Sequence, residues 1–212
     1  MQSIYDTVII KDISQRHSLR NVENLHRIVS FLFDSIGSYV SPTNIAAQLN
    51  HNSPKTISHN TIIKYLDFLT QSYILYAAPR YDIKGKELLS TNGKYYVVDL
   101  GLKNITATNK HEADLGRKLE NIVYFELFRR GGKVYVGKHN DREIDFVVQK
   151  ANNEREYYQV AYTVNDEKTF NREISAFGRI KDNYPKFLLT LDYDNTNIKG
   201  IQKINVIDWL LE

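Results

Sequence analysis

Apolar residues recur every three or four positions in three stretches of the N-terminal half, which is the period of an α-helix. The stretches cover residues 22–36, 42–49 and 58–69. The first two follow Asn21 and Ser41, whose side-chain oxygens can cap a helix N-terminus by accepting a hydrogen bond from a free backbone N–H, and the third begins at Ser58. Pro42 suits the first position of the second helix. The pattern predicts three consecutive amphipathic helices.

Two strand-like runs follow these helices. Residues 73–78 and 95–99 are rich in aromatic and β-branched side chains. Between them lie residues 84–87 and the pair Asn92-Gly93, and an Asn-Gly pair is a strong turn signal. Three helices followed by a two-stranded ribbon is the order of a winged helix-turn-helix. We expect this domain at residues 21–103.

The C-terminal half alternates helical and strand patterns. Residues 104–111 are polar and without periodicity, so we expect a linker there. The later helices and strands are expected, in chain order, at 114–130, 133–137, 143–149, 156–163, 168–180 and 186–191, with a short strand and a helical turn in 204–211. This order predicts an α/β domain at residues 112–212. Residues 1–20 are too weakly apolar to fold alone, and we expect them to be the end of a helix that belongs to a missing upstream domain or packs on the next domain.

Composition and charge narrow the classes of function. Lys and Arg total 28 against 25 for Asp and Glu, and a net charge of +3 is too small to indicate a nucleic-acid partner by itself. The absence of cysteine excludes disulfides and thiolate metal sites. No apolar run approaches the roughly 20 residues that span a bilayer, and no signal-peptide pattern begins the chain. We therefore expect a cytoplasmic protein without a membrane partner.

A partial acidic pattern marks the second domain. Glu120 lies on a predicted helix, and Asp145 lies on a predicted strand with Glu143 two residues earlier on the same face. These segments resemble the core of metal-dependent nucleases, in which a helix Glu and a strand Asp precede a Glu-x-Lys on the next strand. Gln159 and Ala161 occupy the Glu and Lys positions here. The resemblance implies a restriction-endonuclease-like (PD-(D/E)XK-type) α/β fold with a catalytically degenerate site.

An active site is the alternative hypothesis. The candidate catalytic residues are Glu120, Asp145 and Gln159, and the candidate ligands of a divalent cation such as Mg²⁺ are Glu120, Glu143 and Asp145. A lysine elsewhere would have to replace the missing cation, and Lys118 and Lys138 are candidates. DNA cleavage with Mn²⁺, compared with an Asp145→Ala control, decides between an active and a degenerate site.

The third predicted helix is the candidate recognition helix of the winged module. In helix-turn-helix proteins the exposed N-terminal residues of this helix meet base edges in the major groove. Asn60 suits adenine, and Lys64 suits a phosphate or guanine. A role in protein–protein contact is the alternative for this module. The candidate nucleic-acid contacts are Lys55, His59, Asn60, Lys64, Arg80, Lys84 and Lys86.

Several segments together resemble one protein family. Residues 115–124, 143–146 and 180–186, with 5–13 and 80–86, resemble the C-terminal region of prokaryotic AAA-type ATPases. Those ATP-binding proteins join an N-terminal P-loop ATPase core to a winged helix and an uncharacterised restriction-endonuclease-like domain. The resemblance covers nearly the whole chain. It implies an accessory module whose partners are DNA, an ATPase core or a second copy of the chain.

The sequence departs from that family in one respect. It contains no Gly-x-x-x-x-Gly-Lys-Ser/Thr loop to cradle a phosphate, since Gly131-Gly132-Lys133 lacks both the earlier glycine and the following hydroxyl. ATP is therefore not an expected ligand of this chain. We expect an accessory C-terminal module that binds nucleic acid or a partner protein. The alternatives are a divalent-metal-dependent DNA nuclease using Glu120 and Asp145, and a purely structural role.

Overall fold

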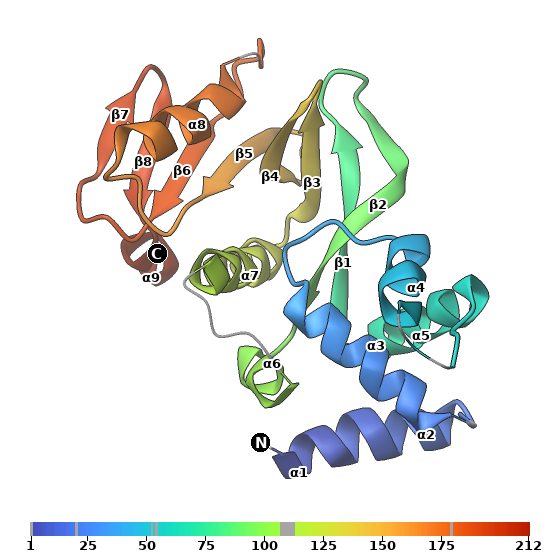
Figure 1. Ribbon diagram of the computed structural model, residues 1–212. Coiled ribbons are helices and arrows are strands. Elements are labelled where there is room, and N and C mark those ends of the chain that lie inside the picture. Colours follow the sequence, from blue (N-terminus) through green and yellow to red (C-terminus); the bar gives the residue numbers. More distant parts are fainter. Residues whose placement is uncertain (1, 20, 52, 54, 107–112, 179) are drawn as a thin grey trace. The chain divides into compact units, whose positions relative to one another are not determined.

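The computed structural model describes residues 2–19, 21–51, 53, 55–106, 113–178 and 180–212. It is a mixed α/β protein (Figure 1) that divides into two compact units. The first unit comprises Met1–Ala77 and Asn92–His111, and the second comprises Ala78–Thr91 and Glu112–Glu212. The tip of the ribbon thus belongs with the C-terminal unit, because its first strand pairs with a strand of that unit. Much of the expected linker, residues 107–111, lies outside the described residues.

The first unit is mainly helical. Its helices are α1 (Gln2–Ile4), the π-helix η1 (Tyr5–Asp12), α2 (Ile13–Arg16), α3 (Val22–Asp34), α4 (Pro42–Asn50), α5 (His59–Gln71) and α6 (Leu100–Thr106). The predicted N-caps of α3 and α4 are confirmed, because Asn21 and Ser41 each accept a hydrogen bond from the backbone N–H three residues later. Ser58, predicted as the first residue of the third helix, is instead the N-cap of α5 and accepts from the Thr61 N–H. The predicted helices therefore begin where their capping residues place them.

The N-terminal segment packs within the first unit. Tyr5, Ile9 and Ile13 are buried in the same apolar cluster as Leu25 of α3. The Tyr5 hydroxyl also lies 3.2 Å from Nδ1 of His26. Residues that seemed too weakly apolar to fold alone are thus stabilised by burial against α3.

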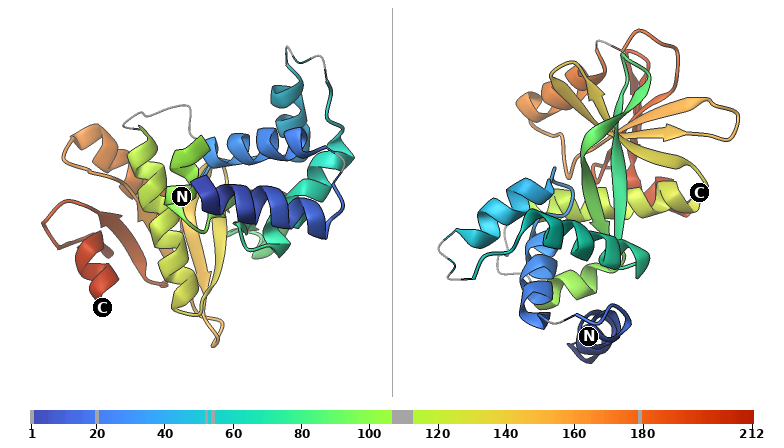
Figure 2. Two further views of the ribbon diagram at one scale, coloured as in Figure 1. Left: turned by 90° about the horizontal axis from the view of Figure 1, so that it is seen from below. Right: turned by 90° about the vertical axis from the view of Figure 1, so that its right-hand side faces the viewer.

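The ribbon consists of β1 (Leu75–Asp82) and β2 (Glu87–Val97), drawn from two further sides in Figure 2. It turns at residues 83–86, where the Lys86 N–H donates to the Asp82 carbonyl (2.8 Å) and Lys86 has φ +58°. The expected turn at Asn92-Gly93 is wrong, because β2 runs through both residues. The outer edge of β2 pairs there with the segment after α3: the Val40 N–H donates to the Gly93 carbonyl, and Tyr39 forms an antiparallel bridge with Lys94.

The second unit is built around a mixed sheet. It contains α7 (Ala113–Arg129), β3 (Lys133–His139), β4 (Arg142–Gln149), β5 (Arg155–Val160), α8 (Glu167–Phe177), β6 (Lys186–Thr190), β7 (Thr196–Ile198), β8 (Ile201–Asn205) and α9 (Val206–Leu211). Among the described residues the strand order is β2-β1-β3-β4-β5-β6-β8-β7. The β3–β4 and β4–β5 pairs are antiparallel, whereas β1–β3, β5–β6 and β6–β8 are parallel.

Helices α7 and α8 cover opposite faces of this sheet (Figure 1). Phe146 of β4 lies against Tyr124 of α7, with ring centroids 6.1 Å apart, whereas the next residue, Val147, is buried in a cluster with Phe177 of α8. Successive strand residues point to opposite faces, so the two helices lie on opposite sides. A β-bulge sets two residues of β4, Asp145 and Phe146, against one residue of β3.

Candidate functional site

Strands β4 and β5 stop pairing regularly beside Asp145. Their register runs from Gln149 opposite Arg155 to Phe146 opposite Tyr158. Beyond that point the two strands are joined by hydrogen bonds from backbone N–H groups to side-chain oxygens. The Asp145 N–H donates to Oε1 of Gln159 (2.7 Å), and the Val160 N–H donates to Oδ2 of Asp145 (2.8 Å). Asp145, Gln159 and Val160 are called the β4–β5 fork below.

Gln159 links the fork to helix α8. Its Nε2 donates to Oε2 of Glu173 (2.8 Å), and the two residues are only 6% and 7% exposed. Oε1 of Glu173 accepts hydrogen bonds from Nε and Nη2 of Arg172, at 3.0 and 2.6 Å. Only one orientation of the Gln159 amide satisfies both the Asp145 N–H and the Glu173 carboxylate. Gln159 therefore acts as a neutral connector between β4 and α8.

Helix α8 also closes the position of the missing lysine. Ala161 is 8% exposed and lies in one apolar cluster with Ala176 and Phe177 of α8. Its N–H donates to the Leu189 carbonyl of β6. A lysine in this apolar cluster would bury an ammonium group, which costs free energy. The residues at positions 159 and 161 therefore suit a covered face rather than an open catalytic cleft.

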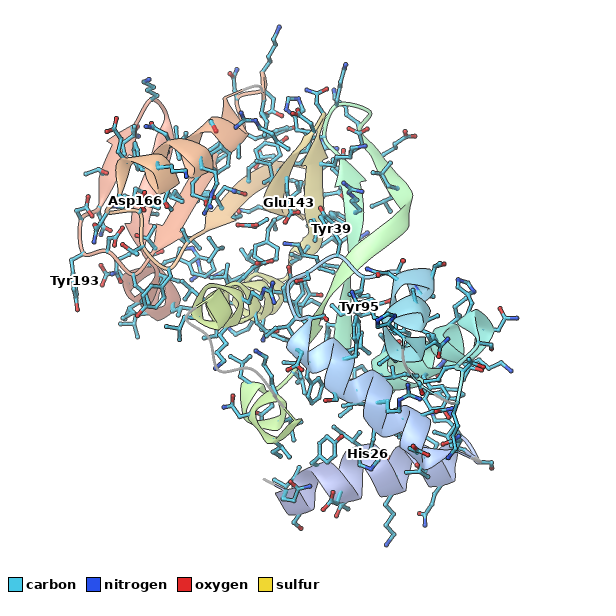
Figure 3. The ribbon with its side chains drawn as sticks, in the orientation of Figure 1. His26, Tyr39, Tyr95, Glu143, Asp166 and Tyr193 are labelled. Atoms are coloured by element: carbon cyan, nitrogen blue, oxygen red, sulfur yellow. The ribbon has the colours of Figure 1, made fainter. Side chains whose placement is uncertain are left out.

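The other predicted metal ligands lie on α7 and on β4. Glu120 is a buried residue of α7, the helix on the Phe146 face of the sheet. Glu143 on β4, labelled in Figure 3, lies directly opposite Lys138 of β3. The described part of the chain brings no three His, Cys, Asp or Glu side chains close enough together to hold a metal ion.

The fork fits a divalent cation poorly. Mg²⁺ takes a near-octahedral set of hard oxygen ligands. One oxygen of Asp145 already accepts from the Val160 N–H, and the oxygen of Gln159 already accepts from the Asp145 N–H. No chemical step through a metal follows from this arrangement, and the nuclease hypothesis stays a prediction.

Helix α5 presents a second candidate site. Its apolar side chains Ile62, Tyr65, Leu66 and Leu69 are buried in the first unit. The opposite side exposes His59, Asn60, Ile63 and Lys64 over the first turn and a half. These four residues are called the α5 surface below. The helical period therefore separates a packed face from a face open to a partner.

The turn before α5 is held by side-chain hydrogen bonds. The Asn50 side chain donates to the Ile57 carbonyl (2.9 Å) and accepts from the Ile57 N–H (2.7 Å). Arg27 of α3 donates to the Leu49 carbonyl and to Oγ of Ser53. These contacts fix where α5 starts relative to α3 and α4.

The predicted nucleic-acid contacts fall into two groups. In the first unit, Lys55 forms an ion pair with Glu23 (3.0 Å). His59, Asn60 and Lys64 make no side-chain hydrogen bond or ion pair with another described residue. Arg80, Lys84 and Lys86 belong to the second unit; Arg80 is half-buried and the two lysines are exposed at the ribbon turn.

The protein is thus a mixed α/β protein of two units, with the exposed α5 surface in the first unit and the covered β4–β5 fork in the second. Residues 1–113 match the family described as "Domain of unknown function (DUF8612)", and the chain belongs to this family. No solved structure matches the chain. None of the described helices is long and apolar enough to cross a membrane.

Two relatives match nearly the whole chain. An uncharacterized protein of Haemophilus influenzae is 41% identical over 213 residues, which cover 100% of this chain and 52% of that protein. The uncharacterized protein MJ1544 of Methanocaldococcus jannaschii is 30% identical over 219 residues, which cover 98% of this chain and 46% of that protein. The chain spans about half the length of these relatives.

Proposed function

We propose that the first unit is a winged helix-turn-helix that binds duplex DNA with the α5 surface in the major groove. The observation that carries the proposal is the Tyr39–Lys94 bridge. It adds the segment between α3 and α4 to the edge of the β1–β2 ribbon, so that three helices and a small sheet form one module. In such modules the third helix is the one that reads DNA.

The chemistry of the α5 surface supports this proposal. Asn60 has an amide that can pair in bidentate fashion with adenine, and Lys64 can meet a phosphate. Ile63 is 44% exposed and offers an apolar contact for a thymine methyl group. Because none of the described residues engages the polar groups of His59, Asn60 or Lys64, DNA can bind them without breaking a protein contact.

Replacing Lys64 by Gln is expected to weaken duplex binding about tenfold at roughly 50 mM salt, because a phosphate contact is lost. The slope of log K against log salt should fall in magnitude by about one. Fluorescence anisotropy with a labelled duplex of about 20 base pairs measures both quantities.

Lys11→Gln is the matched control for this experiment. Lys11 is an exposed lysine of η1 in the same unit, so its removal changes the net charge equally. The control should keep the wild-type affinity within about twofold, since a distant surface charge contributes little. Equal losses in the two variants, or no wild-type binding at about 50 mM salt, would contradict the proposal.

We also propose that this chain acts as the accessory module of an AAA-type ATPase. The relatives carry roughly as much chain again outside the matched region, which is room for an ATPase core. The module would then position that core on DNA.

The full-length Haemophilus influenzae relative provides the test of this second proposal. It should hydrolyse ATP, and DNA should change its rate only while the region matching this chain is present. A full-length relative without ATP hydrolysis would contradict the proposal, as would a DNA response that survives deletion of the matched region.

A further inference from the structure

A second basic surface lies on the C-terminal unit. A groove of about 650 Å³ is lined by the ribbon turn, the β4–β5 turn and the loop before β6. A neighbouring groove of about 670 Å³ shares Ile83, Lys86 and Asp182 with it and adds Lys84 and Lys181. The two grooves together are called the ribbon-turn groove.

Arg155 is the central cation of the ribbon-turn groove. Its guanidinium lies 5.3 Å from the ring centre of Tyr81 and 5.9 Å from that of Tyr184. Within the described parts of the chain no oxygen accepts a hydrogen bond from this guanidinium, and no carboxylate pairs with it. Two tyrosine rings therefore hold a planar fork of N–H donors in place, and its hydrogen-bonding capacity is unused.

Tyr81 carries a second unused polar group. The residue is 7% exposed, and its buried hydroxyl has no hydrogen-bond partner among the residues that the structure describes. An unpaired buried hydroxyl costs roughly 1–3 kcal/mol of stability. Burial raises the pKa of Tyr81, while Arg155 acts in the opposite direction, so the hydroxyl remains a donor at neutral pH. Tyr81 lines neither of the two grooves, so it contributes to the site through the ring that lies beside Arg155.

The carboxylates of the groove are mostly engaged already. Glu156 pairs with Lys150 at 2.5 Å and accepts from the Tyr158 hydroxyl. Asp182 accepts from the Tyr157 hydroxyl at 2.6 Å and lies 3.6 Å from Lys186. Exposed Glu154 is the remaining acidic residue of the lining.

The ribbon-turn groove holds more cationic than acidic side chains that are not already engaged by another described residue. Lys84, Lys86 and Lys181 are exposed, and no ion pair to another described residue neutralises them. With Arg155 they form a run of positive charge along the two adjoining grooves. Such a run attracts an extended anion more strongly than a single small one.

We propose that the ribbon-turn groove binds the phosphate backbone of single-stranded nucleic acid. Arg155 takes one phosphate in bidentate fashion, and Lys86, Lys84 and Lys181 meet the phosphates that follow. Tyr184, which lines the groove, offers a ring on which a base can stack. The proposal concerns residues of the second unit only and stands apart from duplex binding by the α5 surface.

Arg155→Gln is expected to weaken binding of a labelled oligothymidylate of about ten nucleotides at least tenfold at roughly 50 mM salt. Fluorescence anisotropy measures the affinity, and an oligouridylate of equal length distinguishes DNA from RNA as the source of the phosphates. Lys168→Gln, on exposed α8 surface outside the grooves, is the matched control and should stay within about twofold. The emission of Trp209, the only tryptophan, reports whether each variant keeps the second unit folded.

Tyr81→Phe is a control that removes only the hydroxyl and keeps the ring beside Arg155. Removing the unpaired hydroxyl should maintain or raise the urea midpoint of the second unit, because a buried unsatisfied group disappears. Oligothymidylate binding should stay within about twofold, because the ring beside Arg155 remains. Unchanged affinity in Arg155→Gln overturns the proposal, as does a wild-type protein that ignores both oligonucleotides at low salt. Lys64→Gln leaves single-strand binding intact, so failure of duplex binding is recognised separately.

Discussion

Gln159→Glu is expected to destabilise the second unit by about 3 kcal/mol at pH 7. In the wild type the Gln159 amide donates to the Glu173 carboxylate across 2.8 Å, and both residues are buried. A carboxylate at position 159 would remove the donor and place two like charges in contact. The midpoint of urea unfolding, followed through Trp209, measures the loss in this unit.

The penalty should depend on pH. Two buried carboxyl groups in contact share one proton, so one of them acquires a folded-state pKa above its unfolded value of about 4.3. A carboxyl group with a raised folded pKa destabilises the native state as pH rises through that window. The variant should therefore lie closer to wild type at about pH 4.5 than at pH 7.

The double variant Gln159→Glu with Glu173→Gln provides the control. It exchanges donor and acceptor, so the amide of one side chain again donates to the carboxylate of the other. Most of the lost stability should return, and the double-mutant cycle should give a coupling of about 2 kcal/mol. A double variant no more stable than Gln159→Glu alone would show that the contact does not set the penalty. The contact between the side chains at positions 159 and 173 also explains why introducing Glu at 159 and Lys at 161 alone should not yield an active nuclease.

Local patterns predicted the first unit well where a cap and an apolar stripe coincide. Helix α3 begins at the residue after its predicted cap, Asn21, and α5 begins one residue after the predicted start at Ser58, because both signals act over a few residues. Helix α6 was missed. It is short, and Lys103 within it is almost fully buried, which no local hydrophobic pattern indicates. Contacts distant in sequence decide such a segment.

The ribbon shows how tertiary pairing overrides a turn signal. Asn92-Gly93 carries the chemistry of a tight turn, yet β2 continues through it because Tyr39 pairs with Lys94 on the outer edge. The actual turn places Lys86 at a positive φ next to Gly85. Turn-forming residues occur both at Asn92-Gly93 and around Gly85, and the sequence alone could not decide which of the two segments forms the turn.

The fork was foreseen only in part. Sequence spacing placed Asp145 and Gln159 on neighbouring strands, and the β4–β5 register agrees with that placement. Glu173, the partner that explains the glutamine, comes from α8, and no local signal connects it to β5. Arg155 and Tyr81 likewise meet only through the strand order β1-β3-β4-β5. The sequence therefore predicted candidate side chains within one helix or strand, but it did not predict the contacts between side chains of different elements.

Lys203→Met is expected to cost the second unit about 3 kcal/mol, comparable to breaking other buried ion pairs. Nζ of Lys203 lies 3.4 Å from Oδ2 of Asp192, and both side chains are 6% exposed. Asp192 also accepts hydrogen bonds from the Thr163 hydroxyl and the Val164 N–H. Without the lysine, Asp192 stays buried and charged with no cation to offset its desolvation. Urea unfolding followed through Trp209 measures the change.

The pH profile of this variant tests the electrostatic explanation. Burial opposes ionisation of Asp192, but the Thr163 and Val164 hydrogen bonds and Lys203 together hold its pKa below the ordinary value. A carboxyl group with a lowered folded pKa stabilises the native state above its unfolded pKa of about 3.9, and this contribution disappears as pH falls through the folded pKa. Removing Lys203 should raise the folded pKa and so flatten the acid limb below about pH 4.

Asp194→Asn is the matched control, because Asp194 also contacts Lys203 (2.5 Å) but has a side chain that is 61% exposed. Solvent screens this pair, so the control should lose less than about 1 kcal/mol and keep the acid limb of the wild type. Adding Asp192→Asn to Lys203→Met should recover much of the loss, since the uncompensated charge is removed. If adding Asp192→Asn recovers none of the loss, packing of the lysine stem and not the Asp192 charge holds β8 to the loop after β6.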